Sequence, residues 1–98
     1  MAEALILEFD GFTKETYLAV NERLGIDPRD GSGDWPDGLT SHTATVKDGG
    51  LVVYEIWESR DQQEAFVRDR LGPALQQAGV QGPPARDEWM EIVSHTTP

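Results

Sequence analysis

The sequence predicts an α+β fold in which one antiparallel sheet is covered by two helices. Apolar and β-branched runs alternate with capped amphipathic stretches in the order strand, helix, strand, strand, helix, strand. Asp48-Gly49-Gly50 is a strong hairpin turn signal between the two middle strands. The stretch from Gly50 to Leu71 indicates a strand followed by an abrupt helix start at Ser59.

A strand over residues 3–9 and a helix over residues 14–24 open the chain. The strand is a short apolar run with little alternation, which is typical of a strand covered on both faces: Leu5, Ile6, Leu7 and Phe9. Thr13 is a suitable N-cap, and Gly25 is a natural C-terminal stop. The core-facing stripe of this helix has three- and four-residue spacing: Tyr17, Val20 and Leu24.

Residues 26–38 are dense in turn formers and acidic residues, and loops of this length often serve as lids or binding loops. Trp35 is the only large apolar residue beyond the first position of this loop. It either packs back to pin the loop or caps a pocket, and both interpretations stay open. Asp27, Asp30 and Asp34 lack the spacing and the final Glu of a calcium loop, so we expect no metal site there.

The second half of the chain is predicted to form a hairpin and a second helix. The hairpin strands are expected at residues 39–47 and 51–58. Ser59 caps the helix in a capping box. Because Pro73 lacks an amide hydrogen and clashes with the preceding turn, Gly72-Pro73 should kink or split this helix, with Pro73 starting the second piece.

A last strand over residues 85–94 completes a ferredoxin-like βαββαβ order with a four-stranded antiparallel sheet. The chain length fits one domain over residues 1–98. The sheet face opposite the helices is still partly apolar, and so short a chain buries only a modest core. Packing two such sheets face to face would bury that surface, so we expect a homodimer.

Composition excludes several classes of function. A net charge of −10 with eight scattered basic residues disfavours nucleic acid and anionic membrane surfaces as partners. The absence of cysteine removes disulfides, thiolate nucleophiles and Fe–S clusters. The N-terminus has no basic region of a signal peptide, and no segment approaches the length of a membrane span. These features lead us to expect a cytoplasmic protein.

The hairpin predicts a polar site on one face of the sheet. If the turn has an even number of residues, His42 lies opposite Glu55 or Trp57, and all three side chains project from the same face. A three-residue turn would move one strand's side chains to the other face. Tyr54 falls on the opposite face, where core or interface packing is its expected role.

His42 and Glu55 are the candidate catalytic pair, because a carboxylate can orient or charge an imidazole whose pKa lies near neutrality. Trp57 would then form an apolar wall of the site. The alternative is that the pair is only a hydrogen-bonded polar patch inside an interface. With two separated histidines and no cysteine, we expect no dedicated transition-metal site, although His42 with Glu55 could supply two ligands.

Three further residues are candidates for substrate binding. Tyr17 and Asn21 lie one helical turn apart, so their polar ends could converge on a ligand. Core packing explains Tyr17 more simply. Trp35 is the third candidate, through the pocket-capping interpretation of the loop.

The segment Val-Tyr-Glu-Ile-Trp-Glu-Ser, ending at Ser59, with a capped helix containing Glu64-Ala65-Phe66, resembles the antibiotic biosynthesis monooxygenase-like group of the dimeric α/β barrel superfamily. Within it, the segments Gly38 to His42 and Arg70 to Leu75 resemble small, mostly uncharacterised members.

The resemblance implies a homodimer with facing sheets and a pocket between sheet and helices. It also implies chemistry on small organic molecules, such as cofactor-independent oxygenation of quinol-like aromatics or cyclisation and isomerisation of polyketide-like compounds. Many relatives carry a histidine on the second helix, but residues 66–69 of this chain are Phe-Val-Arg-Asp. Haem binding is therefore not carried over, and we expect no cofactor.

Three hypotheses from different classes follow. The chain is a small-molecule enzyme of the oxygenase, cyclase or isomerase type, a ligand-binding module without turnover, or a dimeric protein whose polar residues only stabilise the fold. The first two require a cavity beside His42 that ligands can reach. The third requires His42 to be packed and fully hydrogen-bonded.

Overall fold

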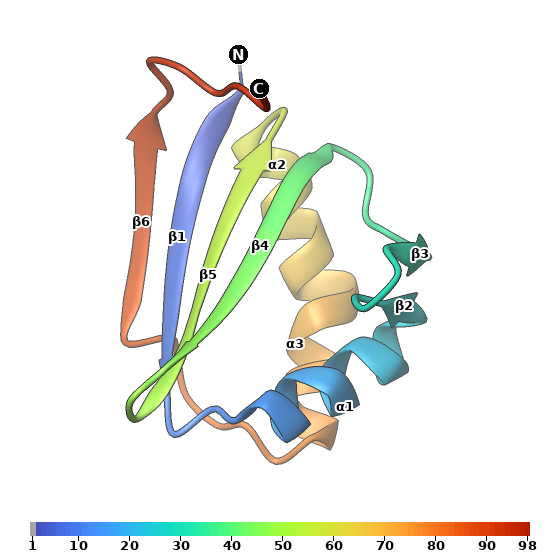
Figure 1. Cartoon of the computed structure of the whole chain (residues 1–98). Coiled ribbons are helices and arrows are strands. Elements are labelled where there is room, and N and C mark those ends of the chain that lie inside the picture. Colours follow the sequence, from blue (N-terminus) through green and yellow to red (C-terminus); the bar gives the residue numbers. More distant parts are fainter. Residues whose placement is uncertain (1) are drawn as a thin grey trace.

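The computed structural model describes residues 2–98 and contains a four-stranded antiparallel sheet in the order β4-β5-β1-β6. The strands are β1 (Glu3–Asp10), β4 (Leu39–Lys47), β5 (Gly50–Trp57) and β6 (Arg86–Glu91). The helices α1 (Lys14–Leu24), α2 (Arg60–Phe66) and α3 (Gly72–Gln77) lie on one face of this sheet (Figure 1). The predicted ferredoxin-like α+β fold is confirmed.

Side-chain caps set the helix boundaries where the sequence predicts them. The hydroxyl of Thr13 accepts a hydrogen bond from the Thr16 amide at 3.1 Å, and α1 ends at Gly25 with φ 76°. At the second helix, the Ser59 hydroxyl accepts from the Gln62 amide at 3.2 Å. The last strand is shorter than predicted and covers Arg86–Glu91.

The second helical region has no gap, and it is divided at the predicted place into two α-helices. A π-helical turn, η1 (Val67–Leu71), joins α2 to α3, and the Gly72 amide donates to the Val67 carbonyl. Pro73 lies in the first turn of α3, as predicted for the start of the second piece. The wider π turn accommodates the proline without breaking the helix. A Cβ at position 72 would lie 2.8 Å from the Val67 carbonyl oxygen, so this turn requires glycine.

The hairpin has a two-residue turn, Asp48-Gly49, with Lys47 paired to Gly50. An even-length turn was predicted, and this register selects Glu55 over Trp57 as the residue opposite His42. A β-bulge between Leu39 and Ser41 then shifts the pairing near the start of β4.

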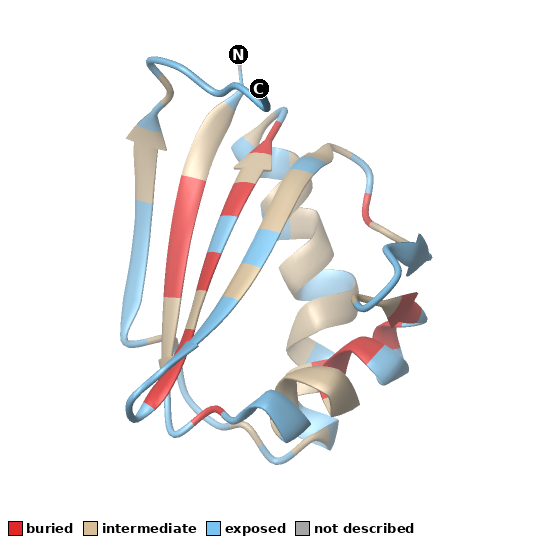
Figure 2. Cartoon of the chain, viewed as in Figure 1, coloured by how far each residue is buried: buried red, intermediate tan, exposed pale blue. Residues whose placement is uncertain are grey.

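The two faces of the sheet have different cover. Leu5, Leu51 and Trp57 are the most deeply buried side chains and face the helices. Along β5, buried residues alternate with more exposed ones (Figure 2). Tyr54, on the other face, is 49% exposed, whereas Ile6 on that face is buried. Both surfaces of β1 therefore hold buried side chains, as its unbroken apolar run predicts.

Residues 26–38 contain a short ribbon of β2 (Ile26–Asp27) and β3 (Ser32–Gly33), which lies at the end of α1 (Figure 1). Asp27 and Asp30 accept hydrogen bonds from the amides of Arg29 and Ser32, so both carboxylates stabilise local turns. Across residues 2–98, none of the helices combines the length and apolar character that a membrane crossing needs.

Candidate active site

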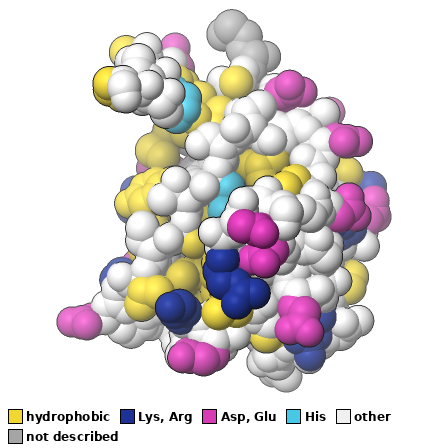
Figure 3. All heavy atoms as spheres, turned by 45° about the vertical axis from the view of Figure 1, so that its right-hand side comes forward, with side chains coloured by type: hydrophobic (Ala, Val, Ile, Leu, Met, Phe, Trp, Pro, Cys, Tyr) yellow, Lys and Arg dark blue, Asp and Glu magenta, His cyan; other side chains and the backbone are white. Residues whose placement is uncertain are grey.

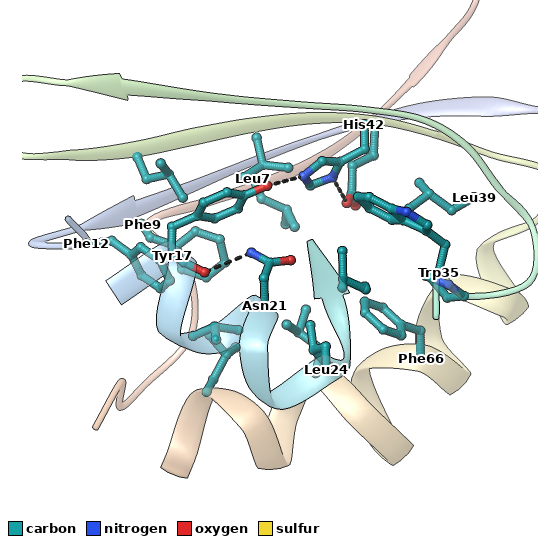
Figure 4. Close-up of a pocket in the computed structure, with 18 residues that line it drawn as sticks. Leu7, Phe9, Phe12, Tyr17, Asn21, Leu24, Trp35, Leu39, His42 and Phe66 are labelled. Carbon is teal, nitrogen blue, oxygen red and sulfur yellow. Dashed lines mark hydrogen bonds and ion pairs between the residues drawn. The ribbon is translucent and has the colours of Figure 1, made fainter. Parts of the chain in front are cut away.

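A small cavity of about 60 Å³ lies between the sheet and the helices, beside His42. Most of its 18 lining residues are apolar and come from β1, α1, β5 and the second helical region (Figure 4). The polar residues among them are Tyr17, Asn21, His42 and Glu55. The fold therefore brings four of the six predicted site residues together, and Trp35 is a fifth lining residue.

His42 joins two other site residues by short hydrogen bonds. Its Nδ1 lies 2.8 Å from Glu55 Oε2, and its Nε2 lies 2.6 Å from the Tyr17 hydroxyl. Because an ionised carboxylate only accepts, Nδ1 carries the proton, which leaves Nε2 of the neutral imidazole to accept from Tyr17. The Tyr17 and His42 rings are nearly parallel, with 7° between their planes and 6.1 Å between centroids. This orientation makes Nε2 a base held against a phenol.

Glu55 is held from both sides. It is only 8% exposed, and its second oxygen accepts from the Trp57 indole N–H at 3.0 Å. The two residues point to the same face because they are two positions apart in β5. A buried carboxylate with both oxygens bonded to donors is fixed in position.

Trp57 does not form the apolar wall of the site that we expected. It is fully buried behind Glu55, packs against Phe66 at a centroid distance of 5.9 Å, and does not line the cavity. The reason is the register, which sets Glu55 opposite His42 and Trp57 opposite Leu39. Its contribution to the site is the hydrogen bond that orients Glu55.

Tyr17 and Asn21 both reach the cavity from α1, as their spacing predicts. Burial raises the pKa of the Tyr17 phenol, the Asn21 amide opposes that shift, and the negative charge of Glu55 adds to it. The phenol therefore keeps its proton at neutral pH. Asn21 is 5% exposed, and its Nδ2 donates to the Tyr17 carbonyl at 2.8 Å (Figure 4).

Trp35 closes the side of the cavity next to His42, with ring centroids 5.3 Å apart and planes tilted by 55°. Its indole N–H donates to the Gly31 carbonyl at 2.9 Å, so the ring also pins its own loop. The two interpretations left open by the sequence therefore describe one arrangement.

Arg70 supports the site, although the sequence did not predict it as a site residue. From the π-helical turn, its Nη2 donates to the carbonyls of Leu24 at 2.8 Å and Asp34 at 2.6 Å. It thereby ties the end of α1 to the residue before Trp35. The two partners lie 46 and 36 positions away from Arg70 in the sequence, and no spacing rule predicts contacts over such separations.

The electrostatic surroundings of the site are acidic. None of the described lining residues is Lys or Arg. On the face shown in Figure 3, acidic side chains are spread widely, and the whole chain has 18 acidic against 8 basic residues. Within residues 2–98, no group of three or more His, Cys, Asp or Glu side chains is placed to hold a metal ion.

No family model and no curated protein sequence matches the chain. Solved structures match its shape. A candidate antibiotic biosynthesis monooxygenase from Chloroflexus aurantiacus has a TM-score of 0.68 at 10% identity, covering 99% of this chain and 98% of that chain. The Rv0793 protein of Mycobacterium tuberculosis has a TM-score of 0.63 at 19% identity, covering 99% and 100%. The NE2512 protein of unknown function from Nitrosomonas europaea has a TM-score of 0.64 at 16% identity, covering 100% and 96%.

At these identities the likeness shows the fold. The fold of one chain that the resemblance implies is confirmed, because all three neighbours extend over almost the whole chain. Because one fold serves many activities, the function must be argued from the site.

Proposed function

We propose that the protein is an acid–base enzyme that removes a proton from a small aromatic or polyketide-like substrate, leading to cofactor-independent oxygenation or to cyclisation or isomerisation. The single observation that carries this proposal is His42, held between the Glu55 carboxylate and the Tyr17 phenol at 2.8 and 2.6 Å. A base oriented by a carboxylate and hydrogen-bonded to a hydroxyl is the arrangement used to activate hydroxyl groups.

Tyr17 would act as the proton relay of this site. As its hydroxyl proton moves to His42 Nε2, the phenol oxygen takes a proton from the substrate. The imidazolium that forms is stabilised by Glu55, whose second oxygen stays bonded to Trp57. The raised pKa of Tyr17 supports a phenol that passes protons on without remaining ionised.

The substrate anion has two possible fates. With O₂ as co-reactant, the anion is oxidised, one oxygen atom forms a C–O bond, and the second leaves as water with both substrate hydrogens, giving a carbonyl. Without O₂, return of the proton to another carbon isomerises the substrate, or attack on its own carbonyl closes a ring. The description of the Chloroflexus aurantiacus neighbour favours the first fate.

Substrate entry requires the cavity to widen. Its volume of about 60 Å³ is well below the roughly 150 Å³ of a protein cavity that accepts benzene. Residues 26–38 are the movable wall, since Trp35 stands on this loop between two glycines in the left-handed region, Gly25 at φ 76° and Gly38 at φ 90°. We propose that this loop is a lid and that Arg70 holds it closed.

A homodimer through the open face of the sheet belongs to the same proposal. A groove crosses this face between Tyr54, Ile56 and Met90 and the chain end near Val93, which is 95% exposed. Apolar side chains on an uncovered sheet favour packing against a second copy. The two sites would then lie on the outer, helix-covered sides.

The alternative is a protein that binds a small ligand without turnover, or one whose buried polar residues serve the fold alone. The hydrogen-bonding groups of His42 and Glu55 are all satisfied within the protein, which suits a structural role. The apolar cavity beside them favours binding.

Turnover assays on a panel of quinol-like and polyketide-like aromatics separate these functions. Oxygen uptake and product mass spectrometry should detect turnover by the unmodified protein. His42→Ala and Glu55→Gln should lower kcat about 100-fold or more. Tyr17→Phe should lower it by at least tenfold, whereas Tyr54→Phe, a matched phenol on the other face, should not change it. If the His42 and Glu55 variants turned over substrate as fast as the unmodified protein, the catalytic assignment would be wrong. Binding without turnover would favour the alternative.

A further inference from the structure

Trp57 stands at the buried end of a line of hydrogen bonds that runs through the site. Its indole N–H donates to Glu55 Oε1 at 3.0 Å, and Glu55 Oε2 accepts from His42 Nδ1 at 2.8 Å. The line continues from His42 Nε2 to the Tyr17 hydroxyl at 2.6 Å. Trp57 is 0% exposed, whereas the His42 side chain is 17% exposed. The line therefore begins in the core and ends beside the cavity.

The indole fixes the direction of this line, because an indole N–H can only donate. Oε1 of Glu55 must remain an acceptor, so any proton that the carboxylate receives has to go to Oε2, the oxygen bonded to His42. A hydrogen bond to an ionised carboxylate favours the charged form. The indole accordingly opposes proton transfer from Nδ1 to the carboxylate, and it draws negative charge away from Oε2.

Both effects reduce the affinity of the His42–Glu55 pair for a further proton. The pair can hold that proton as an imidazolium, which less negative charge on Oε2 stabilises less. It can also hold the proton as a carboxylic acid, which the indole disfavours directly. Because the two groups are in contact, they titrate as one pair, and the indole lowers the proton affinity of that pair.

Few other charges face the pair. Of the described residues that line the cavity, only Tyr17 titrates besides the pair itself, and those from the loop and the second helical region are uncharged. On β1, Glu3 lies opposite Trp57 and forms an ion pair with Arg60 at 2.7 Å, which has no net charge. Among the described residues, the indole is the only donor to Glu55 besides His42.

We infer that Trp57 is a positioning residue that lowers the proton affinity of the His42–Glu55 pair and so keeps His42 Nε2 free to act as a base at neutral pH. This inference rests on the proposed function, and it gives a core tryptophan a part in the proton relay. Trp57 acts through Glu55, since its own ring does not line the cavity.

The test removes the indole N–H and keeps the size of the side chain. In Trp57→benzothienylalanine, a sulfur atom replaces the N–H, so the ring still packs but no longer donates. The titration of the His42 ring is followed by ¹H,¹³C NMR, with the exposed His95 as internal reference. The midpoint of His42 should rise by about one pH unit, since a hydrogen bond to a charged group changes an equilibrium about tenfold. An unchanged or lowered midpoint would overturn the inference.

Trp89 offers a matched control for this replacement. It is partly buried on β6, and the Arg60 guanidinium lies over its ring at 5.2 Å. Trp89→benzothienylalanine should leave the midpoint of His42 unchanged, and an equal rise in both variants would contradict a specific role of Trp57.

The unmodified protein provides a measurement that does not depend on a variant folding. Its Trp57 indole signal in ¹H,¹⁵N spectra should shift with the same midpoint as the His42 ring, because the two share one carboxylate. An indole signal that ignores this titration would also overturn the inference. A raised midpoint in the Trp57 variant without turnover by the unmodified protein would keep the role of Trp57 and remove the proposed enzyme. Turnover with an unchanged midpoint would do the reverse.

Discussion

Glu55 and Tyr54 are neighbours in β5 but have different surroundings. Glu55 is 8% exposed, faces the helices, and has both oxygens bonded to other side chains of the protein. Tyr54 is 49% exposed and faces away from the helices. One face of the strand thus completes its polar contacts within the chain, and the other leaves its tyrosine half exposed.

The difference comes from what covers each face. Helices and the 26–38 loop enclose the first face, so a charged group there must be hydrogen-bonded and can be tuned. The second face has no helical layer, and its aromatic and apolar side chains suit another sheet. The two-residue period of the strand thus places a buried, fully hydrogen-bonded carboxylate and a half-exposed phenol on opposite faces.

The largest expected effect is on the enclosed face. Glu55→Ala leaves two buried donors, His42 Nδ1–H and the Trp57 indole N–H, without an acceptor. We expect a loss of about 3 kcal/mol in the free energy of unfolding, measured by urea denaturation. Glu58→Ala, at the exposed position just after the same strand, should stay within about 0.5 kcal/mol. Similar losses in the two variants would contradict the division between faces.

The next effect tests the open face. In Tyr54→Lys, each copy would bring a new cation into the proposed interface, so the dimer dissociation constant should rise about 30-fold, or ~2 kcal/mol. Sedimentation equilibrium measures this change directly. Val46→Lys adds the same charge at a position that is 63% exposed near the hairpin turn, and it should leave association unchanged. If the unmodified protein sedimented as a monomer, the proposed interface would be wrong.

A smaller effect is expected for the loop of residues 26–38, which covers the enclosed face. Arg70→Gln removes the charged donor to the Leu24 and Asp34 carbonyls, so the loop should open more often. Hydrogen exchange of the amides in residues 34–38 should become about tenfold faster. Arg68→Gln is the matched control, because Arg68 pairs only with its exposed neighbour Asp69. Unchanged exchange in Arg70→Gln would mean that the loop does not depend on this contact.

Local sequence features predict the fold and half of the site. Caps at Thr13 and Ser59 and the Asp48-Gly49 turn act within a few residues, so their effects can be read directly. Strand period places Glu55 and His42 on one face. The choice between Glu55 and Trp57 as partner of His42 depends on where the turn is centred, and the run Asp48-Gly49-Gly50 allows a two-residue turn at either of two positions.

The rest of the site depends on packing between elements. The Tyr17–His42 hydrogen bond joins α1 to β4, and its length depends on how closely the helix approaches the sheet. The Arg70 contacts depend on the π-helical turn, which changes the direction of the residues that follow it. Neither has a periodic signal, because each requires positions far apart in sequence to meet at a set distance.

The smallest effect compares the two tyrosines. Burial raises the pKa of Tyr17, with Glu55 adding to the shift, so the folded chain holds this phenol proton more tightly than the unfolded chain does. Stability from this group is therefore complete below pH ~10, the ordinary pKa of tyrosine, and is lost as pH rises above that value. In Tyr17→Phe, the decline of the unfolding free energy above pH ~10 should be shallower than in the unmodified protein. Tyr54→Phe, which removes a phenol from the other face, is the matched control for the loss of a hydroxyl. If Tyr17→Phe followed the original slope, the enclosed face would not hold its phenol proton more tightly than the unfolded chain does.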